Sequence, residues 1–231
     1  MSNWEIFWRQ FYELGGYENF LIGLKNTAYI AVFGLLIGMV LGCLFATFKL
    51  LPGKGFFIRF LGIFTDVYVT IFRGTPILVQ LLLIHFVVFP VLGIDISPVL
   101  EAIITFGLNS GAYVSEIMRG GILSVDVGQT EAGRALGLSY GSTMLKIVLP
   151  QAIKNVIPTL GNEFIALLKE TSVVSLIAVM DITKSFQTIG QRTLEVIVPY
   201  LMLAVVYLVI IMIVTGLVKL LERRLRASDR N

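Results

Sequence analysis

Three runs of this sequence contain no charged residue, and each is long enough to cross a lipid bilayer. The runs cover residues 27–48, 74–94 and 196–218, which are 22, 21 and 23 residues long. A helix needs about 20 apolar residues to span the roughly 30 Å hydrocarbon core of a membrane. A water-soluble domain of 231 residues rarely buries three such helices in its core. The pattern therefore predicts an all-α integral membrane protein.

The composition argues against several other classes. Charged residues make up only 14% of the chain, against about 25% in an average soluble domain. The first uncharged run follows a polar stretch and is too long for the apolar core of a signal peptide, so we expect a retained span. Cys43 is the only cysteine, which leaves no internal disulfide and no cysteine-based metal site, and the lone His85 is expected simply to pack. The net charge of +3 is too small to indicate nucleic acid binding.

We expect five membrane spans within a single transmembrane domain that covers residues 1–231. Arg73-Gly74-Thr75-Pro76 interrupts the second span, and the fourth span is the least apolar. A polar stretch over residues 120–150 separates the third span from the fourth. The expected spans cover about residues 21–48, 56–89, 98–119, 153–180 and 196–221.

Lysine and arginine residues are distributed unequally between the two sides of these spans. Twelve fall on the side that holds the first loop, the polar stretch and the C-terminus, and three fall on the other side. Cytoplasmic loops carry the excess of basic residues in membrane proteins. The bias predicts an external N-terminus, a cytoplasmic C-terminus and an external loop at residues 90–97. The basic residues assigned to the cytoplasm are Lys49, Lys54, Arg59, Arg119, Arg134, Lys146, Lys154, Lys219, Arg223, Arg224, Arg226 and Arg230.

The first span carries three glycines at a spacing of four residues. Gly34, Gly38 and Gly42 form two overlapping G-x-x-x-G units on one helix face. Small residues at this spacing let the backbones of membrane helices approach closely. We expect this face to pack against another helix, although glycine is also common in membrane helices in general.

The polar stretch contains the most informative motif of the sequence. Residues 131–150 read E-A-G-x-x-x-G-x9-I-x-L-P. This resembles the cytoplasmic loop of ABC importer permeases, whose pattern begins E-A-A, and Gly133 is the one departure. The resemblance implies a type I importer permease fold with a short coupling helix that docks on an ATPase subunit. The coupling residues it implies are Glu131, Ala132, Gly133, Leu136, Gly137, Leu138, Leu149 and Pro150.

Elementary chemistry adds detail to that loop. Glu131 is expected near a helix start, where a carboxylate favours the positive end of the helix dipole. Gly137 is expected to end the helix, since glycine readily adopts the left-handed conformation there. An ordinary amphipathic surface helix is the alternative.

Further segments resemble the permeases for polar amino acids, the histidine, glutamine, arginine and cystine uptake group. The similarity runs through most of residues 20–226, and one departure is Thr70, where that family often has glutamate. If that glutamate helps to hold a cationic side chain, a basic substrate is less expected here. The segments are Arg73-Gly74-Thr75-Pro76 with Gln80, Asn109-Ser110-Gly111-Ala112-Tyr113 with Glu116 and Arg119-Gly120-Gly121, Gly161-Asn162-Glu163-Phe164 with Lys169-Glu170-Thr171-Ser172, and Glu222-Arg223-Arg224-Leu225-Arg226.

Ionisable residues inside a span cost about 2.5–3.5 kcal/mol each at the helix centre and therefore need a reason. One reason is a polar pocket in which acidic groups take the ammonium of an amino acid and basic groups or free N–H groups take its carboxylate. The other is that these charges pair structurally, as Glu116 and Arg119 can at i, i+3. The residues expected along the substrate pathway are Arg73, Thr75, Asn109, Tyr113, Glu163, Lys169 and Glu170.

The sequence has no G-x-x-x-x-G-K-[ST] motif, so we expect this chain to be no enzyme and to hold no cofactor. The resemblance then implies a permease subunit that moves a polar amino acid by alternating access, with ATP and Mg²⁺ on a partner ATPase. It also implies a second, identical or homologous permease, an extracellular or periplasmic amino-acid-binding protein, and the bacterial plasma membrane as location. A permease for another small solute, an ATP-independent transporter and a channel are the alternatives.

Overall fold

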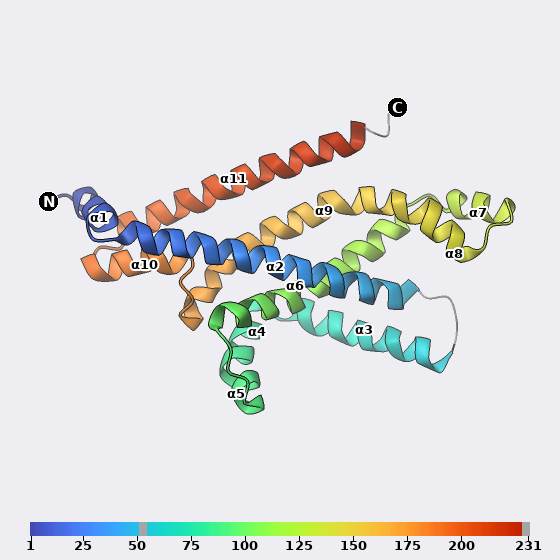
Figure 1. The fold of residues 1–231 in the computed structure, drawn as a ribbon, viewed down its shortest axis with the longest axis horizontal. Coiled ribbons are helices and arrows are strands. Elements are labelled where there is room, and N and C mark those ends of the chain that lie inside the picture. The colour runs from blue at the N-terminus through green and yellow to red at the C-terminus, as the bar shows by residue number, and fades with distance from the viewer. Residues whose placement is uncertain (51–54, 228–231) are drawn as a thin grey trace.

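The computed structural model describes residues 1–50 and 55–227, and these residues form helices with no β-strand among them. Lys54 and Arg230, which entered the count of basic residues, lie outside the described residues. The two longest helices, α2 (Gly16–Leu50) and α11 (Ile197–Ala227), run along the long axis of the molecule (Figure 1). Both have the length and apolarity to cross a membrane.

The second expected span is a bent one. Helix α3 (Phe56–Gly74) is followed by α4 (Ile77–Leu83), the π-helical turn η1 (Ile84–Val88) and α5 (Phe89–Leu92). The two halves meet at an angle of 104°, and only together are they long and apolar enough to cross a membrane. The sequence predicted this interruption at Arg73–Pro76 because glycine and proline disfavour a continuous helix there.

Helices α6 (Pro98–Leu123) and α9 (Leu149–Glu170) complete the bundle. The fourth expected span, residues 153–180, is not one continuous α-helix. Helix α9 ends at Glu170 and continues as a 3₁₀-helix, η3 (Thr171–Ile177), because hydroxyl groups bond to the backbone three residues earlier. Thr171 Oγ1 donates to the Leu168 carbonyl at 2.8 Å, and Ser175 Oγ donates to the Ser172 carbonyl at 2.9 Å.

Shorter helices lie at the two ends of the bundle (Figure 1). Helices α1 (Asn3–Tyr12) and α10 (Ile182–Thr193) lie at the end where α2 and α11 begin. Helices α7 (Val127–Ala135) and α8 (Tyr140–Thr143) lie at the opposite end, and the π-helical turn η2 (Met144–Val148) leads from α8 into α9. Among the described residues, the segments that the basic residues assign to one side of the membrane thus lie toward one end of the molecule.

The glycine face of α2 packs directly on α6, as the sequence predicted. A Cβ atom added at Gly38 would lie 2.7 Å from Ser110 Cβ, and one at Gly42 would lie 2.5 Å from Val114 Cγ1. On α6, a Cβ atom at Gly107 would lie 2.6 Å from Ile37 Cγ2. These separations leave no room for a side chain, so the close approach of the two helices depends on glycine from both sides.

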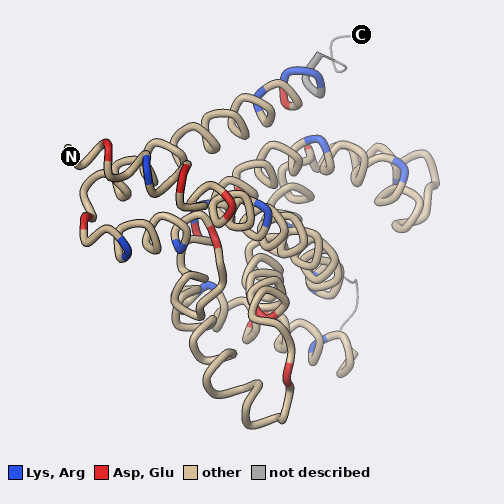
Figure 2. Tube along the Cα trace, turned by 60° about the vertical axis from the view of Figure 1, so that its left-hand side comes forward, with Lys and Arg blue, Asp and Glu red and all other residues tan. Residues whose placement is uncertain are grey.

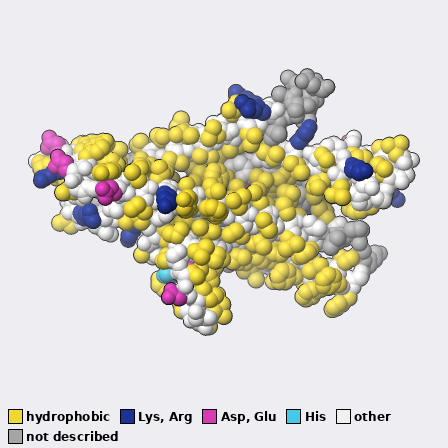
Figure 3. All heavy atoms as spheres, in the orientation of Figure 1, with side chains coloured by type: hydrophobic (Ala, Val, Ile, Leu, Met, Phe, Trp, Pro, Cys, Tyr) yellow, Lys and Arg dark blue, Asp and Glu magenta, His cyan; other side chains and the backbone are white. Residues whose placement is uncertain are grey.

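Two apolar clusters form the core. The larger joins α2, α4, α6, α9 and η3 through side chains such as Ile30, Leu81, Phe106, Leu167 and Val174. The smaller holds α1 and α10 against α11, and its buried members are Phe7, Ile182, Phe186, Ile189 and Val198. Outside these clusters, large hydrophobic side chains cover the middle of the surface, while most Lys and Arg side chains in view lie toward the ends (Figure 3). A belt of exposed apolar surface between charged ends is what a bilayer requires.

Candidate functional site

The break between α3 and α4 is set by four consecutive residues. Helix α3 ends at Gly74, Thr75 is extended at φ −122° and ψ 143°, and Pro76 precedes the first turn of α4. Proline disfavours the helical conformation in the residue before it, which places Thr75 in the extended region. The backbone groups at such a break need other partners, because lipid offers none.

Two amide side chains supply those partners. Gln80 Nε2 donates to the carbonyl oxygens of Phe72 at 2.9 Å and Thr75 at 3.0 Å, and to Thr75 Oγ1 at 2.9 Å. Asn109 Nδ2, from α6, donates to the Phe72 carbonyl at 3.3 Å and to Gln80 Oε1 at 3.0 Å. Both amides are buried. Asn109 and Thr75 were predicted as pathway residues, whereas Gln80 appeared only within a motif. An amide four residues after the break could have indicated a side chain that bonds the freed backbone groups.

Charged side chains of both signs gather beside this break. Arg73 lies over the ring of Tyr113, with its Cζ atom 5.3 Å from the ring centroid. The Glu163 carboxylate of α9 accepts a hydrogen bond from Ser110 Oγ at 3.0 Å. Glu163 is also within electrostatic reach of Arg73 and of Glu170. Charged residues of both signs accordingly occur together in the middle of the trace (Figure 2).

Not all predicted pathway residues are equally enclosed. Glu163 is half-buried, whereas Lys169 and Glu170 are exposed at the end of α9 and interact electrostatically with each other. The structure thus brings Arg73, Tyr113 and Glu163 together, with Lys169 and Glu170 at the border of the group. Three charged side chains and the aromatic ring on which the arginine lies make up this group. We call it the charged cluster, and its members are Arg73, Tyr113, Glu163 and Glu170.

A second set of charged side chains forms ion pairs between helices. This is the structural pairing that was the alternative for Glu116 and Arg119. Arg119 donates to Glu116 Oε2 from Nε at 3.1 Å and from Nη2 at 2.7 Å. Lys49 Nζ lies 2.9 Å from Glu116 Oε1 and 2.9 Å from Asp66 Oδ1. These contacts join α2, α3 and α6.

The expectation that His85 simply packs is wrong. His85 Nδ1, in η1, lies 2.5 Å from Glu101 Oε2 of α6. Glu101 is buried, and a buried carboxyl group needs a polar partner, which the single histidine provides. The pair joins the second half of the bent span to α6.

The segment that resembles the coupling loop, residues 120–150, forms a helix that begins earlier than the sequence analysis expected. Helix α7 starts at Val127, and Asp126 caps it by accepting a hydrogen bond from the Gly128 amide at 2.7 Å. Glu131 therefore lies in the middle of the helix and not at its start, which corrects that expectation. The spacing Asp126-x-x-Gln129 is itself a helix-start signature and marks the true boundary.

Gly137 ends this helix as predicted. It has a φ of +78°, its amide donates to the Arg134 carbonyl at 2.9 Å, and the Leu138 amide donates to the Gly133 carbonyl at 3.1 Å. This pair of hydrogen bonds is the Schellman arrangement, which favours glycine at the left-handed position. The turn sends the chain back toward α8.

The loop presents some predicted coupling residues outward and buries others. Glu131, Ala132, Leu136 and Leu138 are exposed, and Leu136 keeps 80% of its surface accessible. Gly133 is buried beneath Thr143, and a Cβ atom there would lie 2.7 Å from Thr143 Cγ2. Leu149 is half-buried and Pro150 exposed, where η2 passes into α9. The outward residues form an uncovered surface of mixed character at this end of the bundle.

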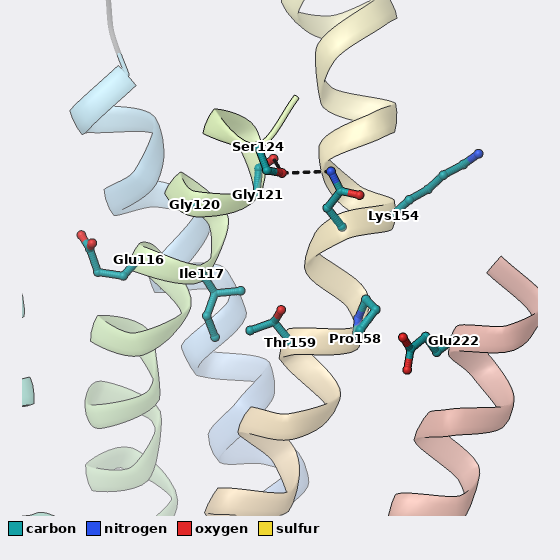
Figure 4. A pocket seen from close by; sticks show the side chains of 10 residues that line it. Glu116, Ile117, Gly120, Gly121, Ser124, Lys154, Pro158, Thr159 and Glu222 are labelled. Atoms are coloured by element: carbon teal, nitrogen blue, oxygen red, sulfur yellow. Dashed lines mark hydrogen bonds between the residues drawn. The ribbon is translucent and has the colours of Figure 1, made fainter. Parts of the chain in front are cut away.

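A pocket of about 690 Å³ opens between α6, α9 and α11 (Figure 4). Asn155 donates to Ser124 Oγ at 2.9 Å across it. None of the predicted pathway residues lines this pocket. Its lining residues are Glu116, Ile117, Gly120, Gly121, Ser124, Lys154, Asn155, Pro158, Thr159 and Glu222.

Comparison with known proteins gives a consistent result. Residues 34–227 match the family described as binding-protein-dependent transport system inner membrane component. The chain is 39% identical to the putative glutamine transport system permease protein GlnP of Rickettsia bellii, over 91% of this chain and 93% of that protein. It is 38% identical to the arginine transport system permease protein ArtQ of Bacillus subtilis, over 92% and 93%. The crystal structure of an amino acid ABC transporter with histidines superposes with a TM-score of 0.84 at 36% identity, covering 92% of this chain and 96% of that one.

Proposed function

Because this chain belongs to the family of binding-protein-dependent transport system inner membrane components, we propose that it is the permease subunit of an ATP-driven importer for a polar amino acid. The observation that carries the substrate class is the charged cluster. An amino acid is a zwitterion, and the cluster offers a guanidinium in Arg73 and a carboxylate in Glu163 within electrostatic reach of each other.

The helix break adds a second means of recognition. Thr75 is extended and exposed at the turn, while Gln80 and Asn109 hold the adjacent carbonyl groups in place. Irregular backbone at membrane depth is tolerated where it lines a cavity or is buried in protein. In the proposal, Arg73 takes the substrate carboxylate, Glu163 takes the ammonium, and Lys169 and Glu170 border the path.

Among polar amino acids the proposal favours a neutral side chain. At residue 70, where the permeases that this chain resembles often have a glutamate that a cationic substrate could use, this chain has threonine. One carboxylate in Glu163 suffices for the ammonium group alone. The relatives named for glutamine and arginine transport support an amino acid in general.

The proposed energy source lies outside this chain. Exposed Ala132, Leu136 and Leu138 on the coupling loop form the docking surface for an ABC ATPase subunit, which carries ATP and Mg²⁺. A second permease copy or a homologous permease completes the pathway, and an amino-acid-binding protein outside the cell delivers the substrate. In the bacterial plasma membrane, with the N-terminus out and the C-terminus in, closure of the ATPase dimer would move the coupling loops and alternate access to the charged cluster.

Substrate-stimulated ATPase activity of the complete complex in vesicles tests this function. With its ATPase and binding protein present, the complex should respond to one or a few polar amino acids. Glu163→Gln should abolish or strongly reduce that response, whereas the matched variant Glu13→Gln, at an exposed carboxylate far along the chain, should retain it. Stimulation by a sugar or an inorganic ion with no response to any amino acid would overturn the substrate class.

A further inference from the structure

The N-terminal helix α1 carries three distinct faces. Ile6, Phe7, Gln10 and Phe11 face the protein, and Phe7 and Gln10 are buried. The Phe7 ring stacks on Phe186 of α10 with centroids 6.3 Å apart. Asn3 Nδ2 also donates to Glu195 Oε1, at 3.4 Å, in the segment before α11. The helix is therefore docked on the bundle and its other two faces have fixed directions.

One outward face is aromatic. Trp4, Trp8 and Tyr12 recur every four residues, which places them in one stripe along a helix of 3.6 residues per turn. They remain 50%, 38% and 64% exposed, and the rings of Trp8 and Tyr12 stack at 5.4 Å. We call these three residues the aromatic stripe. Such large rings would not be left in water without a reason.

The other outward face is charged and lies directly beside the aromatic stripe. Glu5, Arg9 and Glu13 also recur every four residues and are exposed. Arg9 Nε lies 3.3 Å from Glu13 Oε2, and the Glu5 carboxylate accepts a hydrogen bond from the Ser2 amide at 2.9 Å. These charges are satisfied within the helix itself and suit contact with water.

The direction of α1 relative to the spans matches a membrane surface. Figure 1 shows α1 nearly end-on, while α2 and α11 run along the long axis of the molecule. If α2 and α11 cross the bilayer, α1 lies crosswise to them, in the plane of the membrane. Exposed apolar residues also occur in the turn after α1 and near the beginnings of both spans, including Leu14, Leu21 and Ile197.

We propose that α1 is an interfacial anchor whose aromatic stripe inserts into the headgroup region of the phospholipid bilayer at the end where α2 and α11 begin. Tryptophan and tyrosine favour this depth because their rings are apolar and their N–H and O–H groups are polar. The charged face turns to the water. The anchor fixes the depth of α10 and of the first turn of α2 relative to the bilayer, because both pack on α1.

The sequence makes this proposal directly measurable, because its two tryptophans are both in the aromatic stripe. The full-length chain is reconstituted in phosphatidylcholine vesicles that contain lipids brominated either near the headgroup or near the bilayer centre. Tryptophan emission should fall most with the shallow bromines, less with the deep ones, and only weakly with aqueous acrylamide. Trp4→Phe and Trp8→Phe then report each position separately.

Two controls in the Trp4→Phe/Trp8→Phe background calibrate depth and side. Arg9→Trp places the only tryptophan on the charged face, and it should respond to acrylamide and little to brominated lipid. Val40→Trp, at an exposed position inside the first uncharged run, should respond to the deep bromines. The proposal is overturned if the tryptophan emission of the native chain is unchanged by both brominated lipids and is fully quenched by acrylamide. It is also overturned if the emission changes only when an amino-acid-binding protein is added, since the stripe would then be a protein docking surface.

Discussion

At the scale of single residues, Gly133 shows how a departure from a family pattern is accommodated. Alanine is usual at this place in the motif that residues 131–150 resemble. Here Thr143 fills the space, with its side chain almost fully buried above Gly133. Among the described residues, Thr143 Oγ1 is the buried side-chain atom that has no hydrogen-bond partner. The threonine side chain is therefore held by packing alone, and the glycine at position 133 makes that packing possible.

This geometry predicts the behaviour of a mutant pair. Gly133→Ala places a Cβ atom 2.7 Å from Thr143 Cγ2, and such overpacking costs about 1–3 kcal/mol. Thr143→Ala should cost little, and the double variant should recover the stability of Thr143→Ala or exceed it, because alanine is the better helix former by about 1 kcal/mol. Thermal unfolding of the purified variants measures this. Gly141→Ala, with open space at its Cβ, is the control, and a Gly133→Ala variant as stable as the native chain would refute the packing account.

Gly137 supports a second prediction at this scale. Its φ of +78° disfavours side chains, and nothing lies within 4 Å of a Cβ atom built there. A β-branched residue at Gly137 costs about 1–2 kcal/mol through backbone strain alone. Gly137→Val should leave membrane abundance near normal while less ATPase co-purifies with the permease and transport falls.

Gly137→Asn separates backbone strain from bulk, because asparagine tolerates the left-handed region. It should retain more bound ATPase than Gly137→Val. If transport is lost while the ATPase stays bound at native stoichiometry, docking is not what Gly137 secures. If abundance falls too, the residue is structural and the coupling argument for it fails.

At the scale of elements, the sequence predicted where helices break more reliably than where they begin. Arg73–Pro76 was read correctly as an interruption because proline and glycine act locally. The start of α7 was misplaced because the motif begins at Glu131, whereas the helix itself begins at Val127 after the cap at Asp126. The change from α9 to η3 depends on hydroxyl groups of Thr171 and Ser175 that bond to the backbone, and such bonds compete with the helix only in a suitable context.

The hydrogen bonds at the break between α3 and α4 predict which of two substitutions, at Gln80 or at Asn109, lowers the stability of the protein more. Gln80→Leu removes the donor to two carbonyl groups and to Thr75 Oγ1. It also removes an acceptor of the buried Asn109 amide, and a buried polar group that loses its partner costs about 1–3 kcal/mol. Asn109→Ala should cost less, since Gln80 still donates to the Phe72 carbonyl at 2.9 Å. Thermal unfolding of both variants tests the order. Gln151→Leu, at an exposed amide, is the control, and a greater loss for Asn109→Ala would show that α6 rather than Gln80 holds the break.

At the scale of the whole molecule, the uncharged runs predicted the all-helical membrane class, and the glycine spacing predicted one packed face of α2. The partner of that face was not predictable, because the spacing of Gly34, Gly38 and Gly42 does not name α6. Nor was the pairing of His85 with Glu101, whose positions are 16 residues apart along a bent path. Contacts of this kind arise from the arrangement of helices in space, whereas periodicity and motifs describe one segment at a time.

The last prediction concerns the sides of the membrane. The C-terminal ends of α2, α6 and α11 point toward the end of the molecule that holds α7 and α8 (Figure 1), so labelling one exposed position at this end reports the side of all of them. The positive-inside bias assigns this end to the cytoplasm. In a Cys43→Ala background, Asp95→Cys should react with a membrane-impermeant thiol reagent in whole cells, and Ser139→Cys should react only after the cells are opened. Both positions are exposed in the structure, so a difference in reactivity reflects the membrane and not burial within the chain. Reaction of Ser139→Cys in intact cells, with Asp95→Cys protected, would reverse the topology and place the coupling loop where no ATPase can reach it.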